Sequence, residues 1–482
     1  MTDSLPGVDP HPHDRALSLG TRREEALTHA AELVARAWRD FDAAREVEIE
    51  PSEALIALLD EPLPEAPGDL IADLDRAADV LDASLAQSRP RYLAYIGSSG
   101  LEIGALADLL AASYDINMAL DARAATLLEH QTIGWLAQFL GFPATAGYFT
   151  SGGTISNITA LVAARERALP EGRRTGMHER PAAMYCSAEA HYSVTRAAEL
   201  LGIGRDNVRP VPIDDRRRMS VTHLAALIAA DRDAGVTPMA VIATAGTTLT
   251  GAVDPIGAIA DVCAAEDVWL HVDGAYGLPA AGVERSRPLF AGLERADSVS
   301  VDAHKWMFVP KACSAVLVRH MSDLATAFSH NEAYIPHEGD ALNAVDVTLE
   351  YSRPFRALKL WLALRVHGAQ ALRDAIDGNL RQAQLLYDLA AAHTEFQTRE
   401  HRPQLSITPI RHVLPDCRDV DRHNEELCRA MQGDGRVYIS PAVIDDRTWL
   451  RPCFTNFRTS TDDVHVLLSV AAELGRGLCP DH

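Results

Sequence analysis

The stretch Ser300-Val301-Asp302-Ala303-His304-Lys305-Trp306 places a lysine directly after a short β-branched run that begins at Ser298. The chain of 482 residues has only three lysines, Lys305, Lys311 and Lys359, against 42 arginines. Because a guanidinium group cannot form a Schiff base, a lysine kept in such a chain is a candidate for chemistry that needs a primary amine. By itself, Lys305 is equally well interpreted as a surface cation.

The composition describes a globular protein with a large core, since 47% of the residues are hydrophobic and 23% are charged. The formal net charge of -22 disfavours nucleic acid and anionic membranes as partners, because both attract basic surfaces. The seven cysteines show no CxxC or other metal-ligand spacing, so we expect reduced thiols, no metal site and a cytoplasmic location. The sequence has no signal-peptide core and no run of about 18 apolar residues, and it predicts neither export nor a membrane anchor.

Changes in the apolar pattern divide the chain into four parts. We expect residues 1–20 to be disordered, 21–89 to form a helical segment, 90–365 a large α/β domain and 366–482 a C-terminal α+β domain. In the large part, β-branched runs alternate with Ala/Leu-rich helical runs, which is typical of a mostly parallel sheet covered by helices. The candidate strands are 182–186, 208–212, 239–244, 268–272, 298–301 and 314–318, and in the C-terminal part 405–409, 437–440 and 449–455.

Three further segments fall at predicted strand ends or helix starts, where open α/β sheets bind ligands. Ser151-Gly152-Gly153-Thr154 leads into a helix, so its backbone amides and hydroxyls are suited to a phosphate group. Asp273 closes a hydrophobic strand before the small residue Ala275, an arrangement suited to holding a pyridinium nitrogen protonated. His191 follows another strand and is suited to stacking on an aromatic ring or moving protons. The structural alternatives are helix N-caps for the first two segments and an ordinary histidine for the third.

Taken together, these motifs resemble those of the fold-type I pyridoxal-phosphate (PLP) enzymes. They are most similar to the group II amino-acid decarboxylases, which include aromatic-L-amino-acid, glutamate and cysteine-sulfinate decarboxylases. The resemblance runs from about residue 87 to residue 461 and implies an α/β fold: a seven-stranded, mostly parallel PLP domain, a helical N-terminal segment and a C-terminal α+β domain. It rests on Ser151-Gly152-Gly153-Thr154, Ala190-His191, Gly246-Thr247-Thr248, His271-Val272-Asp273-Gly274-Ala275-Tyr276, His304-Lys305-Trp306, Leu358-Lys359-Leu360-Trp361 and Leu450-Arg451.

Residue by residue, the resemblance implies a PLP site. Lys305 matches the lysine that forms the Schiff base with PLP, Asp273 matches the partner of the pyridine nitrogen, and His191 matches the residue that stacks on the ring. Further matching cofactor-contacting positions are Ser151, Gly153, Thr154, Thr248, Ala275, Asp302 and His304. Asp302 stands where many animal members of the family have Asn.

Tyr334 matches the family's proton donor, a tyrosine on a mobile loop that protonates Cα after CO2 has left. The surrounding residues 329–340 are polar and contain Gly and Pro, which is typical of a lid. Relatives with Phe at this position resemble aldehyde synthases, so Tyr334 favours simple decarboxylation. The structural alternative is a buried loop tyrosine without a chemical role.

The substrate-binding positions match the family less closely. Ser98 lies in a segment that lines the pocket in relatives. Arg451 resembles an arginine that approaches the substrate carboxylate in members with acidic substrates, and a purely structural role fits it equally well. Aromatic-specific members usually place bulky aromatic residues in the segments represented here by Ile96-Gly97 and Met118-Ala119.

The resemblance therefore implies a PLP-dependent decarboxylase that converts an L-amino acid, aromatic by overall likeness, into a primary amine and CO2. It also implies a homodimer with active sites at the subunit interface. Open alternatives are a decarboxylase of acidic or other small amino acids such as glutamate, aspartate or cysteine sulfinate, a related PLP lyase or aldehyde synthase, and a PLP-binding regulatory subunit without turnover. Retention of both Lys305 and Tyr334 argues against the last of these.

Overall fold

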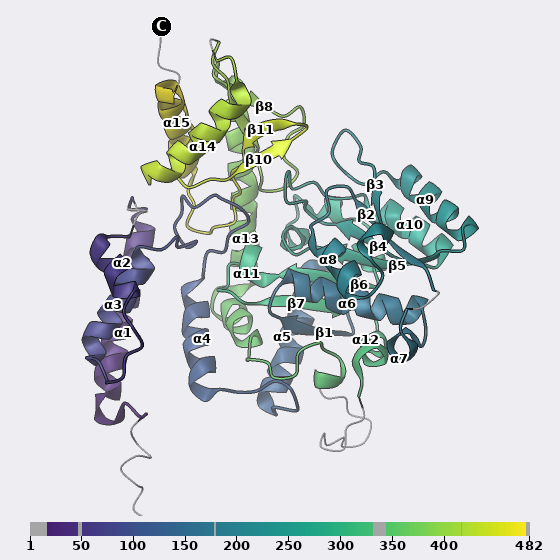
Figure 1. The fold of residues 1–482 in the computed structure, drawn as a ribbon, viewed down its shortest axis with the longest axis horizontal. Helices are drawn as coiled ribbons and strands as arrows, with labels where there is room; N and C mark the ends of the chain where they lie inside the picture. The colour runs from purple at the N-terminus through teal and green to yellow at the C-terminus, as the bar shows by residue number, and fades with distance from the viewer. Residues whose placement is uncertain (1–16, 47–50, 178–179, 331–343, 416, 479–482) are drawn as a thin grey trace, which may run out of the picture. The chain divides into compact units, whose positions relative to one another are not determined.

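The computed structural model describes residues 17–46, 51–177, 180–330, 344–415 and 417–478, and the chain divides into two compact units, 1–86 and 87–482 (Figure 1). The predicted disorder of residues 1–20 falls largely outside the described ranges. In the first unit, the predicted helices are confirmed as α1 (Arg23–Asp42), α2 (Glu53–Leu59) and α3 (Leu70–Asp82). Asp69 caps α3 by accepting a hydrogen bond from the backbone N–H of Ala72 at 2.9 Å, and His29 of α1 contacts Asp75 of α3 at 2.7 Å.

The second unit is built on a seven-stranded sheet in the order β1-β7-β6-β5-β4-β2-β3. All neighbouring pairs from β6 to β3 are parallel, while β7 is antiparallel to both β6 and β1. Six strands therefore point the same way and their carboxyl ends lie along one edge. The bounds are β1 Ala146–Thr150, β2 Ala182–Ser187, β3 Val208–Val211, β4 Thr237–Thr244, β5 Trp269–Asp273, β6 Ser298–Asp302 and β7 Ser314–Val318.

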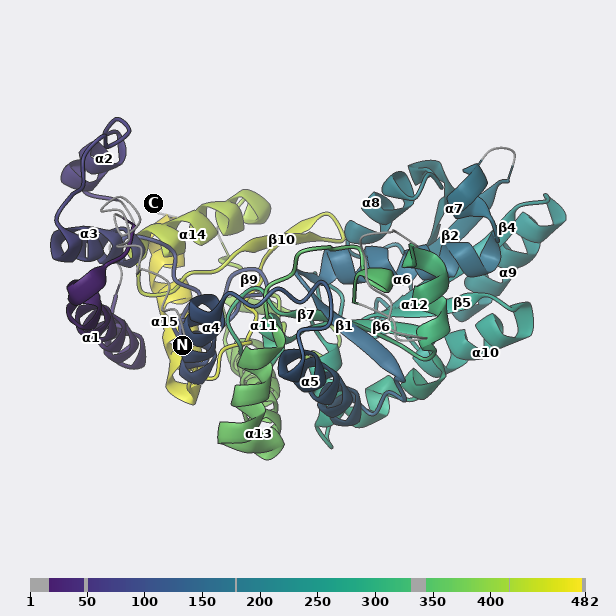
Figure 2. The same ribbon diagram turned by 90° about the horizontal axis from the view of Figure 1, so that it is seen from below.

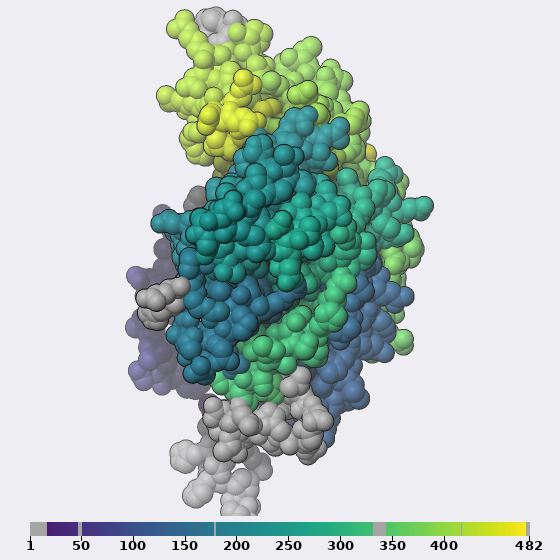
Figure 3. Space-filling view, turned by 90° about the vertical axis from the view of Figure 1, so that its right-hand side faces the viewer, coloured from purple at the N-terminus to yellow at the C-terminus, as the bar shows by residue number. Residues whose placement is uncertain are grey.

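Helices cover both faces of this sheet, as predicted for an α/β fold (Figures 1 and 2). One core contains apolar residues of α6, α8 and α12, and the other contains those of α5, α9, α10 and α13. In Figure 3 the surface over α9 and α10 faces the viewer. The bounds are α4 Glu102–Tyr114, α5 Ala124–Leu140, α6 Gly153–Ala168, α7 Gly172–Thr175, α8 Ser193–Leu200, α9 Val221–Asp233, α10 Ile256–Glu266, α11 Ala303–Trp306, α12 Met321–Phe328 and α13 Ala357–Ala392.

Successive strand residues face opposite cores, as the period of a strand requires. In β4, Val241 and Ala243 lie in the core of α5, α9 and α10, whereas Ala240 and Ile242 lie in the core of α6 and α8. The residues of β5 and β6 that face α6 depart from this apolar rule, because most of them are polar. They are Trp269, His271, Asp273, Ser298, Ser300 and Asp302.

The C-terminal part contains a four-stranded antiparallel sheet in the order β10-β11-β9-β8, with α14 (Val420–Asp434) and α15 (Thr461–Leu478). Its strands are β8 Phe396–Thr398, β9 Ile410–His412, β10 Pro441–Ile444 and β11 Arg447–Leu450. The predicted strand 449–455 overlaps β11 at residues 449–450 and contains an isolated bridge at Cys453. The predicted strands 405–409 and 437–440 contain isolated bridges at Ile407 and Tyr438 in place of a strand. Strand β1 was not predicted. In short strands of this kind, pairing with distant partners decides the bounds more than the local apolar pattern does.

The long helix α13 supports both parts of the second unit. Its N-terminal half packs on α4 and α5, and its C-terminal half packs on α15. Gly368 interrupts it with φ 78° and ψ 156°, a left-handed backbone conformation that glycine adopts without steric cost. None of the helices within the described ranges combines the length and apolar composition needed to cross a lipid bilayer.

Candidate active site

The predicted cofactor residues come from five segments at or just after the ends of different strands. These strands are β1 (Ser151 to Thr154), β2 (His191), β4 (Thr248), β5 (Asp273, Ala275) and β6 (Asp302 to Lys305). Because these strands point the same way, the sheet brings the five segments to one edge. The register makes this explicit, since Thr244 pairs with Asp273, which pairs with Ser300.

Lys305 lies in the short helix α11, immediately after β6. Its Nζ atom is 2.9 Å from Oδ2 of Asp302, the last residue of β6. Burial lowers the pKa of Lys305, but the charge of Asp302, the hydrogen bond to it and the charge of Asp273 together outweigh burial, so the pKa is raised above its usual value. Burial lowers the pKa of His304, whose Nδ1 accepts a hydrogen bond from the backbone N–H of Cys313. Lys305 and Asp302 therefore form an ion pair between a protonated amine and an ionised carboxylate.

The other two lysines have different surroundings. Lys359 is buried on α13 and its amine contacts Asp108 of α4 at 2.8 Å, so it joins two helices. Lys311 donates a hydrogen bond to Oε1 of Gln87. Among the three lysines, Lys305 is the one whose amine is paired with a carboxylate at the strand ends.

The start of α6 comes very close to the ends of β5 and β6. A Cβ atom at Gly153 would lie 2.9 Å from Cβ of Ala275 and 3.0 Å from Oδ2 of Asp302, so a larger residue would displace this contact. The space around Gly152 is open, since a Cβ there would meet no atom within 4 Å. Ser151 is exposed and Thr154 is half-buried beside it. The helix N-terminus thus presents backbone N–H groups to an open space, as an anion site requires.

Asp273 is a buried carboxylate with hydrogen bonds to both oxygens. Oδ2 accepts from Nδ2 of Asn157 at 2.9 Å, and Oδ1 accepts from the backbone N–H of Ala275 at 3.2 Å and the hydroxyl of Ser300 at 3.3 Å. These donors stabilise the ionised carboxylate and hold it in one orientation. Asp273 does not cap an α-helix, because it ends β5 and the next element is the 3-10 helix Leu278–Gly282.

His191 lies four residues after the end of β2 and is half-buried. Its Nδ1 atom is 2.9 Å from the hydroxyl of Ser193 and 3.3 Å from the backbone nitrogen of the same residue. Burial lowers the pKa of His191, and the nearby Asp273 charge opposes this only in part. The imidazole is therefore neutral near pH 7 and able to lie against an aromatic ring.

Arg451 connects two of the predicted segments. Its Nε donates to the carbonyl of Thr248 at 2.7 Å, and one terminal nitrogen donates to the carbonyl of Tyr95 at 2.8 Å. The other terminal nitrogen is buried without a hydrogen-bond partner, and burial lowers the pKa of this guanidinium. Ser98 donates its hydroxyl to the carbonyl of Val309, close in sequence to Lys305. Tyr334 lies outside the described residues.

Sequence reasoning assigned no role to three buried residues that contact the site. Asn157 contacts Asp273 directly, His271 contacts Asn157, and Ser193 contacts both Asn157 and His191. The periodicity of strand and helix could have indicated Asn157 and His271 from the sequence. His271 lies two residues before Asp273 on the same strand face, and Asn157 lies one helical turn after Gly153.

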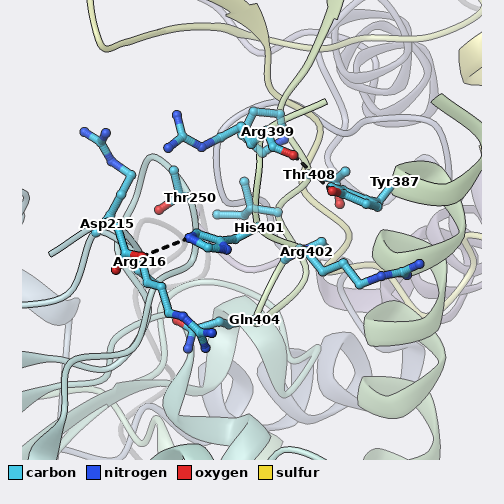
Figure 4. Close-up of a pocket in the computed structure, with 14 residues that line it drawn as sticks. Asp215, Arg216, Thr250, Tyr387, Arg399, His401, Arg402, Gln404 and Thr408 are labelled. Carbon is cyan, nitrogen blue, oxygen red and sulfur yellow. Dashed lines mark hydrogen bonds and ion pairs between the residues drawn. The ribbon is translucent and has the colours of Figure 1, made fainter. Parts of the chain in front are cut away.

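A separate cavity of about 80 Å³ lies between the loop around Arg217 and the segment 399–409 (Figure 4). In its wall, Arg217 contacts Glu189 and Asp445, and His401 lies 3.4 Å from Asp215. None of the predicted site residues lines it. The Arg217–Glu189 pair nevertheless anchors the loop that carries His191, two residues after Glu189.

Comparison with known proteins identifies the family of this chain. The family model described as the pyridoxal-dependent decarboxylase conserved domain matches residues 52–406. The chain belongs to this family. An aromatic-L-amino-acid decarboxylase of Bacillus atrophaeus is 33% identical, with 87% of this chain and 89% of the relative covered. An L-2,4-diaminobutyrate decarboxylase of Rhizobium meliloti (strain 1021) is also 33% identical, with 89% and 87% covered.

The mouse relatives extend the comparison to a solved structure. Cysteine sulfinic acid decarboxylase of Mus musculus is 35% identical, with 63% of each chain covered. The crystal structure of mouse CSAD matches with a TM-score of 0.88 at 28% identity, covering 94% of this chain and 98% of that one. The pyridoxal-dependent decarboxylase described here is therefore a PLP-dependent carboxy-lyase with the predicted α/β fold.

The described residues fit PLP. Lys305 offers an amine, Asp273 offers a fully hydrogen-bonded carboxylate, and the open space beside Gly152 at the start of α6 suits a phosphate group. Oδ1 of Asp302 is buried without a hydrogen-bond partner, so this decarboxylase keeps an unused acceptor next to Lys305. When bound, PLP supplies the electron-withdrawing ring that accepts the electron pair released as the carboxylate leaves.

Proposed function

We propose that this decarboxylase acts on an L-amino acid with an aromatic side chain and releases the primary amine and CO2. The supporting observation is the match, at 33% identity over 87% of the chain, to an aromatic-L-amino-acid decarboxylase. The site geometry supports the chemistry, because a lysine amine, a carboxylate and a neutral imidazole all lie at one edge of the sheet.

The roles of the individual residues are also our proposal. Lys305 attaches the cofactor, Asp273 pairs with the pyridine nitrogen, and His191 lies against the ring. Tyr334 returns the proton to Cα of the product. The phosphate contacts are assigned to Ser151, Gly153, Thr154 and His304, the remaining cofactor contacts to Thr248, Ala275 and Asp302, and the substrate contacts to Ser98 and Arg451.

A second candidate substrate is an acidic amino acid. The position of the Lys311 amine favours this candidate. Burial first, and repulsion by Lys305 next, lower the pKa of Lys311, so its amine lies within electrostatic range of Lys305. Oε1 of Gln87, which accepts from Lys311, also accepts from the backbone N–H of Ser98. A cation beside Ser98 would stabilise a carboxylate or sulfinate side chain, and one relative acts on cysteine sulfinic acid by name.

A substrate panel tests the two candidates. The purified enzyme is given L-tryptophan, L-tyrosine, L-phenylalanine, L-glutamate, L-aspartate, L-cysteine sulfinate and L-2,4-diaminobutyrate, and both CO2 and amine are measured. The aromatic proposal expects the highest kcat/KM among the first three. Lys311→Gln separates the candidates, because loss of a charge-assisted contact should lower kcat/KM about tenfold or more for an acidic substrate and leave an aromatic one nearly unchanged.

We further propose that the enzyme is a homodimer. Helix α4 supports this, because its apolar side chains at positions 106, 109, 110 and 114 are between 45% and 77% exposed. Positions 106, 110 and 114 share one face of the helix, and such a stripe is typical of an interface. Sedimentation of the enzyme and of Leu110→Glu tests this: the variant should dissociate, and a monomeric parent enzyme would contradict the proposal.

We also propose a cytoplasmic location. Five buried cysteines in the described ranges are free thiols, namely Cys186, Cys263, Cys313, Cys428 and Cys453. Buried unpaired thiols suit a reducing compartment. Fractionation of the source cells tests the location, and recovery of the enzyme outside the cytoplasm would contradict it.

A further inference from the structure

A chain of hydrogen bonds runs through the buried layer between α6 and strands β5 and β6. Nε1 of Trp269 donates to the hydroxyl of Ser298 at 2.9 Å, and this hydroxyl is 2.9 Å from Nδ1 of His271. Nε2 of His271 is 3.0 Å from Oδ1 of Asn157. Nδ2 of Asn157 then contacts two acceptors, Oδ2 of Asp273 at 2.9 Å and the hydroxyl of Ser193 at 3.0 Å.

The groups at the two ends of this hydrogen-bond network, Trp269 and Asp273, determine which atom donates in each of its hydrogen bonds. The indole of Trp269 can only donate, so the Ser298 hydroxyl accepts from it. The Asn157 oxygen that faces Nε2 of His271 can only accept, so Nε2 donates and Nδ1 of the neutral ring accepts the proton of the Ser298 hydroxyl. Burial lowers the pKa of His271 to about 4, which agrees with a neutral ring that has one donor and one acceptor.

At the other end, the Asp273 carboxylate fixes the orientation of the Asn157 amide. If the amide were turned over, its oxygen would face the carboxylate oxygen and the Asp273 contact would become repulsive. Both amide protons are therefore used, one for Asp273 and one for Ser193. The Ser193 hydroxyl accepts from Asn157 and donates to Nδ1 of His191, which also accepts the backbone N–H of Ser193.

We propose that Asn157 is a positioning residue for the cofactor site, holding the Asp273 carboxylate with one amide proton and, through Ser193, setting His191 as its Nε2–H tautomer with the other. This inference rests on the proposed roles of Asp273 and His191. It adds a single buried side chain of α6 that fixes both groups at once. The Nε2–H group of His191 is then the one left to face the cofactor ring.

A purely structural role is the competing explanation, since a buried asparagine with satisfied hydrogen bonds stabilises any core. Asn424 is a matched control. It is also fully buried, and it accepts from the backbone N–H of His412 and donates to the carbonyls of His412 and Val420. These contacts lie in the C-terminal part, away from the carboxyl ends of the seven-stranded sheet. Asn157→Leu and Asn424→Leu should therefore both lower the melting temperature.

The decisive measurement is PLP affinity, obtained by titrating each apo-protein with the cofactor and following its absorption. Asn157→Leu should weaken PLP binding about tenfold or more, because it removes a hydrogen bond to a charged group, whereas Asn424→Leu should leave it unchanged. Equal affinities of the two variants would overturn the inference. Failure of the parent protein to bind PLP would instead contradict the proposed function, so the two failures are distinguishable.

Asn157→Asp gives a second, pH-dependent readout that a structural role does not produce. The new carboxylate faces Asp273, with neutral His271 on its other side, His191 beyond Ser193, and the Asp302–Lys305 pair across the site. Two adjacent carboxylates repel, and protonation of one restores a donor. PLP affinity of Asn157→Asp should therefore rise as pH falls from about 8 to about 6, whereas that of Asn157→Leu should not. A flat profile for Asn157→Asp would overturn the inference.

Discussion

The amine of Lys305 and the carboxylate of Asp302 lie 2.9 Å apart, and the two residues are three positions apart in the sequence. Asp302 ends β6 and Lys305 belongs to α11, so the contact forms where the backbone changes from strand to helix. Burial raises the pKa of Asp302, but the charges of Lys305 and His304 reverse this and leave the pKa below its usual value. The pair therefore stays ionised around neutral pH.

Lys305 is expected to be the attachment point of PLP. Treatment of the holoenzyme with borohydride should fix the cofactor, and peptide mapping should find it on Lys305. Lys305→Ala should lose this label, while Lys359→Ala is the control, because Lys359 pairs with Asp108 on another helix. A label on Lys311 or Lys359 would contradict the assignment.

Asp302→Asn should make Lys305 reactive at lower pH. The substitution removes the negative charge that raises the pKa of Lys305, while the burial that lowers this pKa remains. The midpoint of the pH dependence of PLP incorporation into apo-protein should therefore move to lower pH. Asp108→Asn, which affects Lys359 instead, should leave the midpoint in place, and an unchanged midpoint in Asp302→Asn would exclude the electrostatic account.

Asp273→Asn should lower kcat by about a hundredfold or more, even with saturating PLP, because the ring loses its charged partner. Asp254→Asn is the matched control. Asp254 is fully buried and accepts hydrogen bonds from the backbone N–H groups of Met219 and Thr244. We expect that variant to lose stability and keep kcat. Near-normal kcat in Asp273→Asn would show that this carboxylate serves the fold alone.

Tyr334→Phe should change the products of the reaction. Without the phenolic proton, amine yield should fall, and reaction with O2 should give aldehyde, ammonia and hydrogen peroxide together with CO2. All four products and the amine can be measured in one assay. Tyr351→Phe, at an exposed tyrosine in the following segment, is the control. Amine formation at the parent rate would rule out Tyr334 as the donor and direct attention to His191.

The pair His412–His423 should make stability depend on pH. Burial, and then repulsion from His423, lower the pKa of His412 from 6.5 to about 4, and Nδ1 of His412 lies 2.8 Å from Nε2 of His423. Because the unfolded chain binds the proton more readily, stability should be lost as pH falls from about 6.5 towards about 4, by on the order of 2 kcal/mol.

Urea unfolding at several pH values measures this loss. His412→Gln should flatten the pH dependence, because it removes the group that titrates. His401→Gln is the control, since His401 is a half-exposed histidine elsewhere in the fold. An equal slope in parent and His412→Gln would contradict the account.

The sequence alone determined the elements whose signal is local. Six strands of the large sheet lie within about two residues of their predicted positions, because each contains apolar or β-branched residues and ends at a turn or a helix start. Lys305, Asp273 and the Gly152-Gly153 turn were found for the same reason, since each lies next to a strand end or a helix start. The family resemblance rests on these local motifs, and the comparisons confirm the family.

Only the tertiary structure decided which of these motifs meet. Asn157 and Asp273 are 116 residues apart in sequence, and they touch because α6 packs on the face of the sheet that contains β5. Likewise, β1 and the small C-terminal strands depend on partners far along the chain, so their bounds could not be predicted from local patterns. The physical reason is that a hydrogen bond between distant segments is specified by sheet order and register, which no single stretch of sequence encodes.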